Sequence, residues 1–123
     1  MSRTATIGWL RAPEPHNFPA AASYLSLLMP AGAAARVVTR LRKAKPVEFK
    51  AKDIFRASGL SLVGVSNAHV KKDQKKIRRG VPLSPLLLVR DPANGTVIIA
   101  DGYHRLCAVY SFDEDALIPC RIV

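Results

Sequence analysis

Five consecutive residues near the end of the chain, Asp101-Gly102-Tyr103-His104-Arg105, combine groups that can bind anions and transfer protons. They follow the apolar run 97–100 and precede the apolar run 106–109, so a buried strand is expected to turn into a helix here. A helix start offers free backbone N–H groups and the positive end of the helix dipole, and both favour an anion. The spacing therefore predicts a corner that binds phosphate.

Each side chain of this corner has a candidate role. Gly102 would let a ligand approach the backbone closely, and Arg105 offers a bidentate fork suited to phosphate. His104 could donate to a phosphate or transfer a proton near neutral pH. Asp101 could cap the helix, orient His104 or Arg105, act as a base, or hold a metal that bridges phosphates. The candidate catalytic residues are Asp101 and His104, and the candidate phosphate or nucleotide ligands are Gly102, Tyr103, His104 and Arg105.

The same residues also have structural explanations. Asp101 could serve only as the N-cap of the helix, and Arg105 could pair with an acidic residue of the loop 113–115. His104 alone would be an ordinary, partly buried histidine. It is the combination that favours a ligand, and the five residues do not make a Walker loop.

The elements that must position this corner follow from periodicity and turn residues. Strands are expected at 86–90, 96–100 and 117–123. Helices are expected at 17–29, 33–43, 51–58, 68–79 and 104–111. The fold class is therefore α+β, with a small mixed sheet and additional N-terminal helices.

Turn and capping residues set the expected boundaries. Asn17 is the expected N-cap of the first helix, and Pro30 with Gly32 is expected to break it. Gly59 is the expected C-cap of the helix 51–58. Ser66 or Asn67 is the expected N-cap of the helix 68–79. Residues 60–65 are apolar and ambiguous between helix and strand.

The net charge of +10 is unevenly distributed. Residues 1–80 hold 16 of the 19 Lys and Arg and four of the nine Asp and Glu, whereas residues 81–123 carry a balance of −2. Such an excess attracts polyanions. It is densest on the helix 68–79, which carries Lys71, Lys72, Lys75, Lys76, Arg78 and Arg79. This helix is either a solvated connector or a phosphate-facing ridge, and the second interpretation needs it to lie beside the Asp101 corner.

Composition excludes several classes of protein. No run reaches the roughly 18–20 apolar residues that span a bilayer, and no leader followed by a cleavage site is apparent, so we expect a cytoplasmic location and no membrane partner.

Cys107 and Cys120 stand in apolar stretches without CxxC spacing, so we expect two small buried side chains and no zinc site. Trp9, Phe18, Tyr24 and Met29 are expected in the core. The alternative is that they form a docking surface for a protein partner or for a second copy of this chain in a homodimer.

Residues 46–123 resemble the N-terminal domain of the ParB/sulfiredoxin superfamily. The likeness rests on the order strand, hairpin, strand, glycine-led helix and closing strand, and on Gly102, Tyr103, His104, Arg105 and Ala108 at the signature positions. ParB proteins carry Gly-Glu-Arg-Arg-x-Arg-Ala there, and sulfiredoxin carries Gly-Cys-His-Arg. The resemblance implies a signature helix that holds nucleotide phosphates, and a domain at 46–123 with residues 1–45 as a helical extension packed on it.

The sequence departs from this pattern at positions that carry chemistry. Tyr103 replaces both the catalytic Cys of sulfiredoxin and the Glu that supports CTP hydrolysis in ParB, and Cys107 replaces the second signature Arg. We therefore expect no sulfinic acid reductase activity. The helix-turn-helix that follows in ParB has no counterpart in these residues, so we expect no ParB-type DNA loading by this chain alone.

Two hypotheses of function follow. In the first, the corner binds a nucleotide, with Mg²⁺, or another phosphorylated small molecule, and it could support phosphoryl transfer or nucleotide hydrolysis, which need mainly positioning and charge stabilisation. In the second, the protein is a basic accessory module that binds nucleic acid without sequence preference and without catalysis, through the six cations of the helix 68–79. Such binding would depend strongly on salt.

Overall fold

The computed structural model describes residues 6–62 and 67–123, which form five helices and a four-stranded mixed sheet. The helices are α1 (Asn17–Leu25), α2 (Ala31–Lys43), α3 (Ala51–Ser58), α4 (Ala68–Arg78) and α5 (Tyr103–Phe112). The strands are β1 (Val47–Lys50), β2 (Leu86–Asp91), β3 (Thr96–Asp101) and β4 (Leu117–Ile122). The prediction of a small α+β fold is confirmed. Within the described ranges, no helix is long and apolar enough to cross a membrane.

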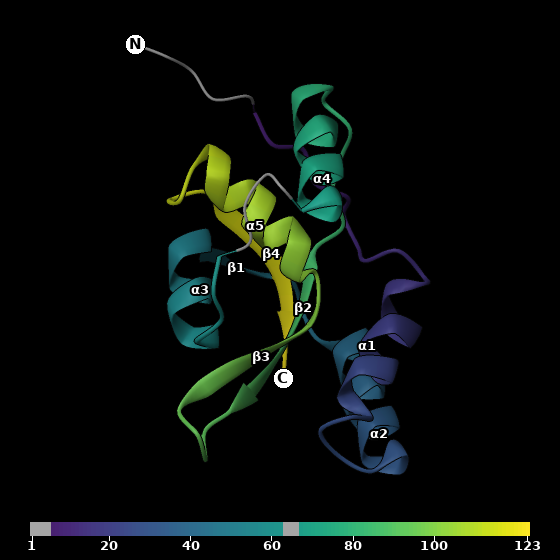
Figure 1. Cartoon of the computed structure of the whole chain (residues 1–123). Helices are drawn as coiled ribbons and strands as arrows, with labels where there is room; N and C mark the ends of the chain where they lie inside the picture. Colours follow the sequence, from purple (N-terminus) through teal and green to yellow (C-terminus); the bar gives the residue numbers. More distant parts are fainter. Residues whose placement is uncertain (1–5, 63–66) are drawn as a thin grey trace.

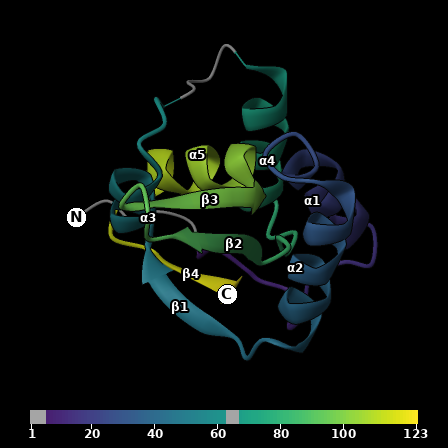
Figure 2. The ribbon, with the colours of Figure 1, turned by 90° about the horizontal axis from the view of Figure 1, so that it is seen from below.

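The sheet has the strand order β1-β4-β2-β3, which Figure 2 shows from below. β2 and β3 form an antiparallel hairpin, β4 lies parallel to β2, and β1 pairs antiparallel with β4 at the edge. The predicted hairpin turn is present: Asn94 Nδ2 donates to Asp91 Oδ2 over 2.8 Å, and Gly95 has a φ of 65°. Because β2 and β3 are joined this tightly, β3 delivers its last residue, Asp101, beside the start of β2.

The central strand β2 is buried on both faces because helices cover both sides of the sheet. Its consecutive side chains point to opposite sides and so enter different clusters. Leu86 and Leu88 contact the cluster formed with α3, α4 and α5, whereas Leu87 and Val89 contact the cluster formed with α1 and α2. Figure 1 shows α1 and α2 on one side of the sheet and α3 and α5 on the other. The molecule is thus a three-layer arrangement in which α4 lies against α5.

Three predictions about the N-terminal helices are wrong. α1 ends at Leu25 instead of residue 29, because Pro30 disfavours helical backbone in the residue before it and the chain tightens into turns at 26–29. Asn17 is not the N-cap; His16 holds that position, and Asn17 Oδ1 accepts from the backbone N–H of Glu14 over 2.8 Å. Gly32 does not break the chain but lies inside α2, which begins directly after Pro30.

Strand β1 is absent from the prediction. Its four residues, Val47–Lys50, are all exposed, and its alternation of apolar and charged side chains is too short to identify a strand. It forms because β4 offers an open edge, with Phe49 opposite Ile118 and Glu48 opposite Pro119.

Most of the other predicted features are confirmed. Gly59 is the left-handed C-cap of α3, and Asn67 caps α4 by accepting from the backbone N–H groups of His69 and Val70. Ser66 and part of the ambiguous segment 60–65 lie outside the described residues. Cys107 and Cys120 are fully buried. Of the predicted core aromatics and methionine, Phe18 is buried, and Trp9 and Met29 pack against the two clusters. The prediction for Tyr24 is wrong, because its side chain is 43% exposed and lines a pocket at the surface.

Candidate functional site

The predicted corner is the junction of β3 and α5. The register of β2 and β3 shifts between Leu87 and Leu88, which gives β3 an extra residue just before Asp101. Such a bulge bends the strand and changes the direction of the side chains that follow. Gly102, with a φ of 111°, is the N-cap of α5, and no side chain caps this helix. The interpretation of Asp101 as the N-cap is therefore wrong.

Gly102 is required by packing at this corner. A Cβ added to it would lie 2.7 Å from Leu86 Cγ and 2.9 Å from Arg105 Nη2. Its positive φ is also unfavourable for residues with a side chain. The absence of a side chain therefore lets α5 start directly against β2.

Asp101 and Arg105 form an ion pair across the first turn of α5. Arg105 Nη2 donates to Asp101 Oδ2 over 2.9 Å, and each side chain is only 16% exposed. The same nitrogen donates to the carbonyl of Pro85 over 3.3 Å, whereas Nε of Arg105 is buried without a partner in the described chain. The suggested pair of Arg105 with the loop 113–115 is wrong, because Asp115 of that loop pairs with Lys52 over 2.7 Å. Asp101 thus orients Arg105, one of the roles expected for it.

Helix α4 lies beside the corner, and together they line a pocket of about 330 Å³. All five corner residues line it, and α4 and the N-terminal segment supply the rest: His16, His69, Lys72, Asp73 and Lys76. The five cations of α4 and Arg79, its C-cap, therefore divide into two groups. Lys72 and Lys76 face the corner, and four exposed cations lie outside the pocket lining: Lys71, Lys75, Arg78 and Arg79.

Three imidazoles surround this pocket. The rings of His69 and His104 are stacked, with centroids 4.9 Å apart and planes at 29°. Burial, followed by the charge of His69, lowers the pKa of His104, and Asp73 opposes this shift. His16 reaches the pocket because the N-terminal segment is anchored: Gly8 and Leu10 exchange backbone hydrogen bonds with Leu83.

Two further groups have shifted titrations. Burial raises the pKa of Asp73, against the opposing charges of Lys76 and Arg105 in the same pocket. Burial, followed by Cys107, raises the pKa of Tyr103, so its hydroxyl stays protonated. That hydroxyl donates to the backbone carbonyl of Ser61, beyond the end of α3, which leaves the aromatic ring of Tyr103 to face a ligand.

A second pocket, of about 440 Å³, adjoins the first. The two share Asp101, Gly102, Tyr103 and His104. The rest of its lining is mainly apolar and comes from α1, β3 and the segment after α3: Ala20, Tyr24, Leu60, Ile99 and Ala100. A charged cavity and an apolar cavity therefore meet at the strand-to-helix corner.

The fit of a magnesium ion can be judged from the donors present. Asp73 and Asp101 are the carboxylates of the charged pocket, and Asp101 is already paired with Arg105. The described residues contain no cluster of three or more His, Cys, Asp or Glu that could hold a metal. Mg²⁺ often keeps its waters and binds through substrate phosphates, so here it would arrive with a nucleotide.

Sequence reasoning missed three pocket residues: His16, His69 and Asp73. His69, Lys72, Asp73 and Lys76 follow helical spacing, so the sequence does indicate that they share one face of α4. Which element that face meets is decided by the packing of α4 on α5. His16 carries no sequence signal, because only the pairing of the N-terminal segment with Leu83 brings it near.

No family model matches this chain, and no curated protein or solved structure gives a significant match to it. The resemblance to the ParB/sulfiredoxin superfamily therefore stays a prediction. Function has to be argued from the residues of the two pockets themselves.

Proposed function

We propose that the corner binds a nucleotide or another small phosphorylated molecule. The observation that carries this proposal is that Lys72 and Lys76 of α4 line the same pocket as the start of α5. Lysine ammonium groups, a helix N-terminus and imidazole N–H groups are all donors suited to phosphate. With neutral histidines the lining holds three cations against two carboxylates, and each protonated histidine adds a further positive charge.

The neighbouring apolar pocket supports a nucleotide over a simple phosphate. Tyr24, Leu60 and the ring of Tyr103 offer apolar and aromatic surface on which a base or another flat group could lie. The phosphates would then lie against Lys72 and Lys76, on the other side of the corner. A cytoplasmic location, as expected from the sequence, suits such a ligand.

Catalysis, if it accompanies binding, would fall to two residues of the corner. His104 is held neutral more readily than an ordinary histidine, so it could accept a proton from an attacking hydroxyl or water. Asp101 would hold Arg105 in place beside the phosphates. Formation of ADP from ATP or CDP from CTP, lost in His104→Ala, is the assay that separates catalysis from binding alone, and release of inorganic phosphate in equal amount identifies water as the acceptor.

Two matched double variants test the binding proposal. Lys72→Ala/Lys76→Ala and Lys71→Ala/Lys75→Ala remove the same charge from the same helix, but only the first pair lines the pocket. By isothermal titration with ATP, CTP and pyrophosphate, each with and without Mg²⁺, the first variant should lose about tenfold in affinity per lysine. The second should bind nearly as the wild type does. Equal losses in the two variants, or no binding of any of these anions by the wild type, would sink the proposal.

The second candidate function is nonspecific nucleic-acid binding by the outward cations of α4 and its C-cap Arg79. The observation in its favour is that Lys71, Lys75, Arg78 and Arg79 are exposed and lie outside the pocket lining. In this case Lys71→Ala/Lys75→Ala should weaken the binding of DNA or RNA. The affinity of the wild type should also fall steeply as the salt concentration rises. An affinity that is unchanged from low to moderate salt contradicts this alternative.

A further inference from the structure

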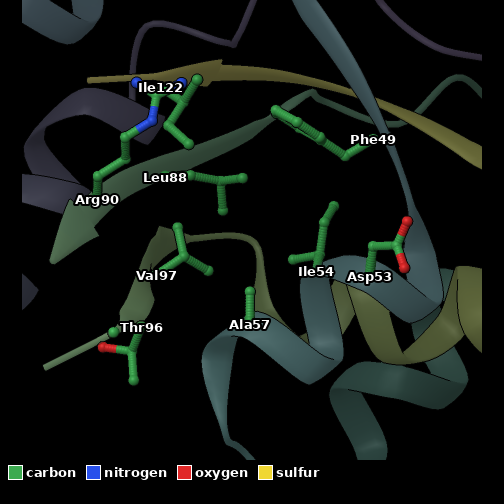
Figure 3. A pocket seen from close by; sticks show the side chains of 10 residues that line it. Phe49, Asp53, Ile54, Ala57, Leu88, Arg90, Thr96, Val97 and Ile122 are labelled. Carbon is green, nitrogen blue, oxygen red and sulfur yellow. The ribbon is translucent and has the colours of Figure 1, made fainter. Parts of the chain in front are cut away.

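A separate pocket lies at the far end of the sheet from the Asp101 corner. It has a volume of about 310 Å³ and shares no residue with the two pockets described above. Its lining comes from β1, α3, the β2–β3 hairpin and the end of β4: Phe49, Asp53, Ile54, Ala57, Leu88, Arg90, Gly95, Thr96, Val97 and Ile122. Figure 3 shows how these side chains surround it.

The pocket exists because the helical layer does not cover this part of the sheet fully. α3 has only eight residues, and Ala57 near its end presents a methyl group where a larger side chain would fill the space. The floor belongs to the core, since Leu88 is 1% exposed and Ile54 is 3% exposed. Phe49, 37% exposed, forms part of the wall at the edge of the sheet. An apolar guest would therefore contact buried core side chains.

Charge is placed asymmetrically around this apolar recess. Arg90 follows Leu88 on the same face of β2, and no salt bridge within residues 6–62 and 67–123 involves it. Asp53 lies at the opposite end of the pocket in Figure 3, where Arg56 pairs with it over 3.4 Å. An anionic group is thus attracted at the Arg90 end, whereas the Asp53 end offers it a carboxylate that is already paired with Arg56.

We propose that this pocket binds a small apolar monocarboxylate. Its hydrocarbon part would lie between Ile54, Leu88 and Val97, and its carboxylate would pair with the guanidinium of Arg90. The volume is at the lower end of the ~300–1,000 Å³ typical of small-molecule sites. It is a recess too small to supply the ~800 Å² that each partner of a stable protein complex buries. The proposal is independent of phosphate binding at the corner.

A pair of probes of nearly equal shape tests it. 2-Naphthoate carries the carboxylate, and 2-naphthalenemethanol replaces it with a neutral hydroxymethyl group. The wild type should bind the acid at least tenfold more tightly in a fluorescence titration. Amide signals of Ile54, Ala57, Leu88 and Val97 should shift when the acid is added to labelled protein.

Three variants complete the experiment. Arg90→Gln should bring the affinity for the acid down to that for the alcohol, and Ala57→Phe should remove the binding of both probes. Ala35→Phe on α2 is the matched control, because Ala35 is also an exposed helical alanine and lies away from this pocket, and it should bind as the wild type does. Equal affinities for the two probes, unchanged binding in Ala57→Phe, or signal shifts centred on the Asp101 corner would each overturn the proposal.

Discussion

Replacing Gly102 with alanine should impose two separable penalties on the folded protein. The first is backbone strain, because a φ of 111° lies in a region that residues with a side chain rarely adopt, and this costs about 1–2 kcal/mol. The second is overlap, because the new Cβ would lie 2.7 Å from Leu86 Cγ and 2.9 Å from Arg105 Nη2, and overpacking typically costs about 1–3 kcal/mol. We therefore expect the free energy of unfolding to fall by about 2–5 kcal/mol in total.

Urea unfolding followed by circular dichroism measures this difference, and Gly80→Ala isolates its first component. Gly80 also has a positive φ, of 72°, but an added Cβ there would have no heavy atom of the described chain within 4 Å. Gly80→Ala should therefore lose only about 1–2 kcal/mol. If Gly102→Ala were no more destabilising than Gly80→Ala, the tight contact of α5 with Leu86 would be refuted.

Three further predictions concern the charges and thiols of the structure. Asp101→Asn removes a carboxylate from the charged pocket, so the affinity for pyrophosphate should rise. It also leaves Arg105 without its ionic partner, so the free energy of unfolding should fall by about 1.5–3 kcal/mol. Weaker pyrophosphate binding in calorimetry would contradict this prediction. Because burial and then His69 lower the pKa of His104, the unfolded chain binds more protons at this residue, and the unliganded protein should lose stability as the pH falls from about 7.5 to about 5.5. Urea titrations should show a smaller loss in His104→Gln, and an identical loss would count against the shift. A thiol reagent should label neither cysteine before unfolding, because both are buried and burial raises the pKa of Cys120 to about 12; rapid labelling of native protein would show otherwise.

Local sequence signals were sufficient for the hairpin and for most helix positions. Asn94-Gly95 specifies its turn through its own backbone preference, and Asn67 and Gly59 act on neighbouring backbone groups. Because these interactions span only a few residues, the local sequence pattern is enough to predict them. β1 could not be predicted in this way, because β4, the strand with which it pairs, lies about 70 residues further along the chain.

The candidate site was predictable in part for the same reason. The residues of the corner are consecutive, so their proximity needs no knowledge of the fold. Asp101 illustrates the limit: its preference for an N-cap position is real, but the bulge before it and the guanidinium of Arg105 determine its contacts. Likewise, the orientation of α4 on α5 decides which of its cations face the pocket and which face outward. No local sequence pattern specifies that orientation.

The central claim is that the strand-to-helix corner binds a phosphate group, and the position of a bound anion tests it most directly. Labelled protein titrated with pyrophosphate at moderate salt should show its largest amide shifts at Gly102–Arg105, with smaller ones at Lys72 and Lys76. Saturation at a single affinity is also expected. Shifts centred instead on Lys71, Lys75 and Arg79, or spread over all basic surfaces without saturation, would contradict the account.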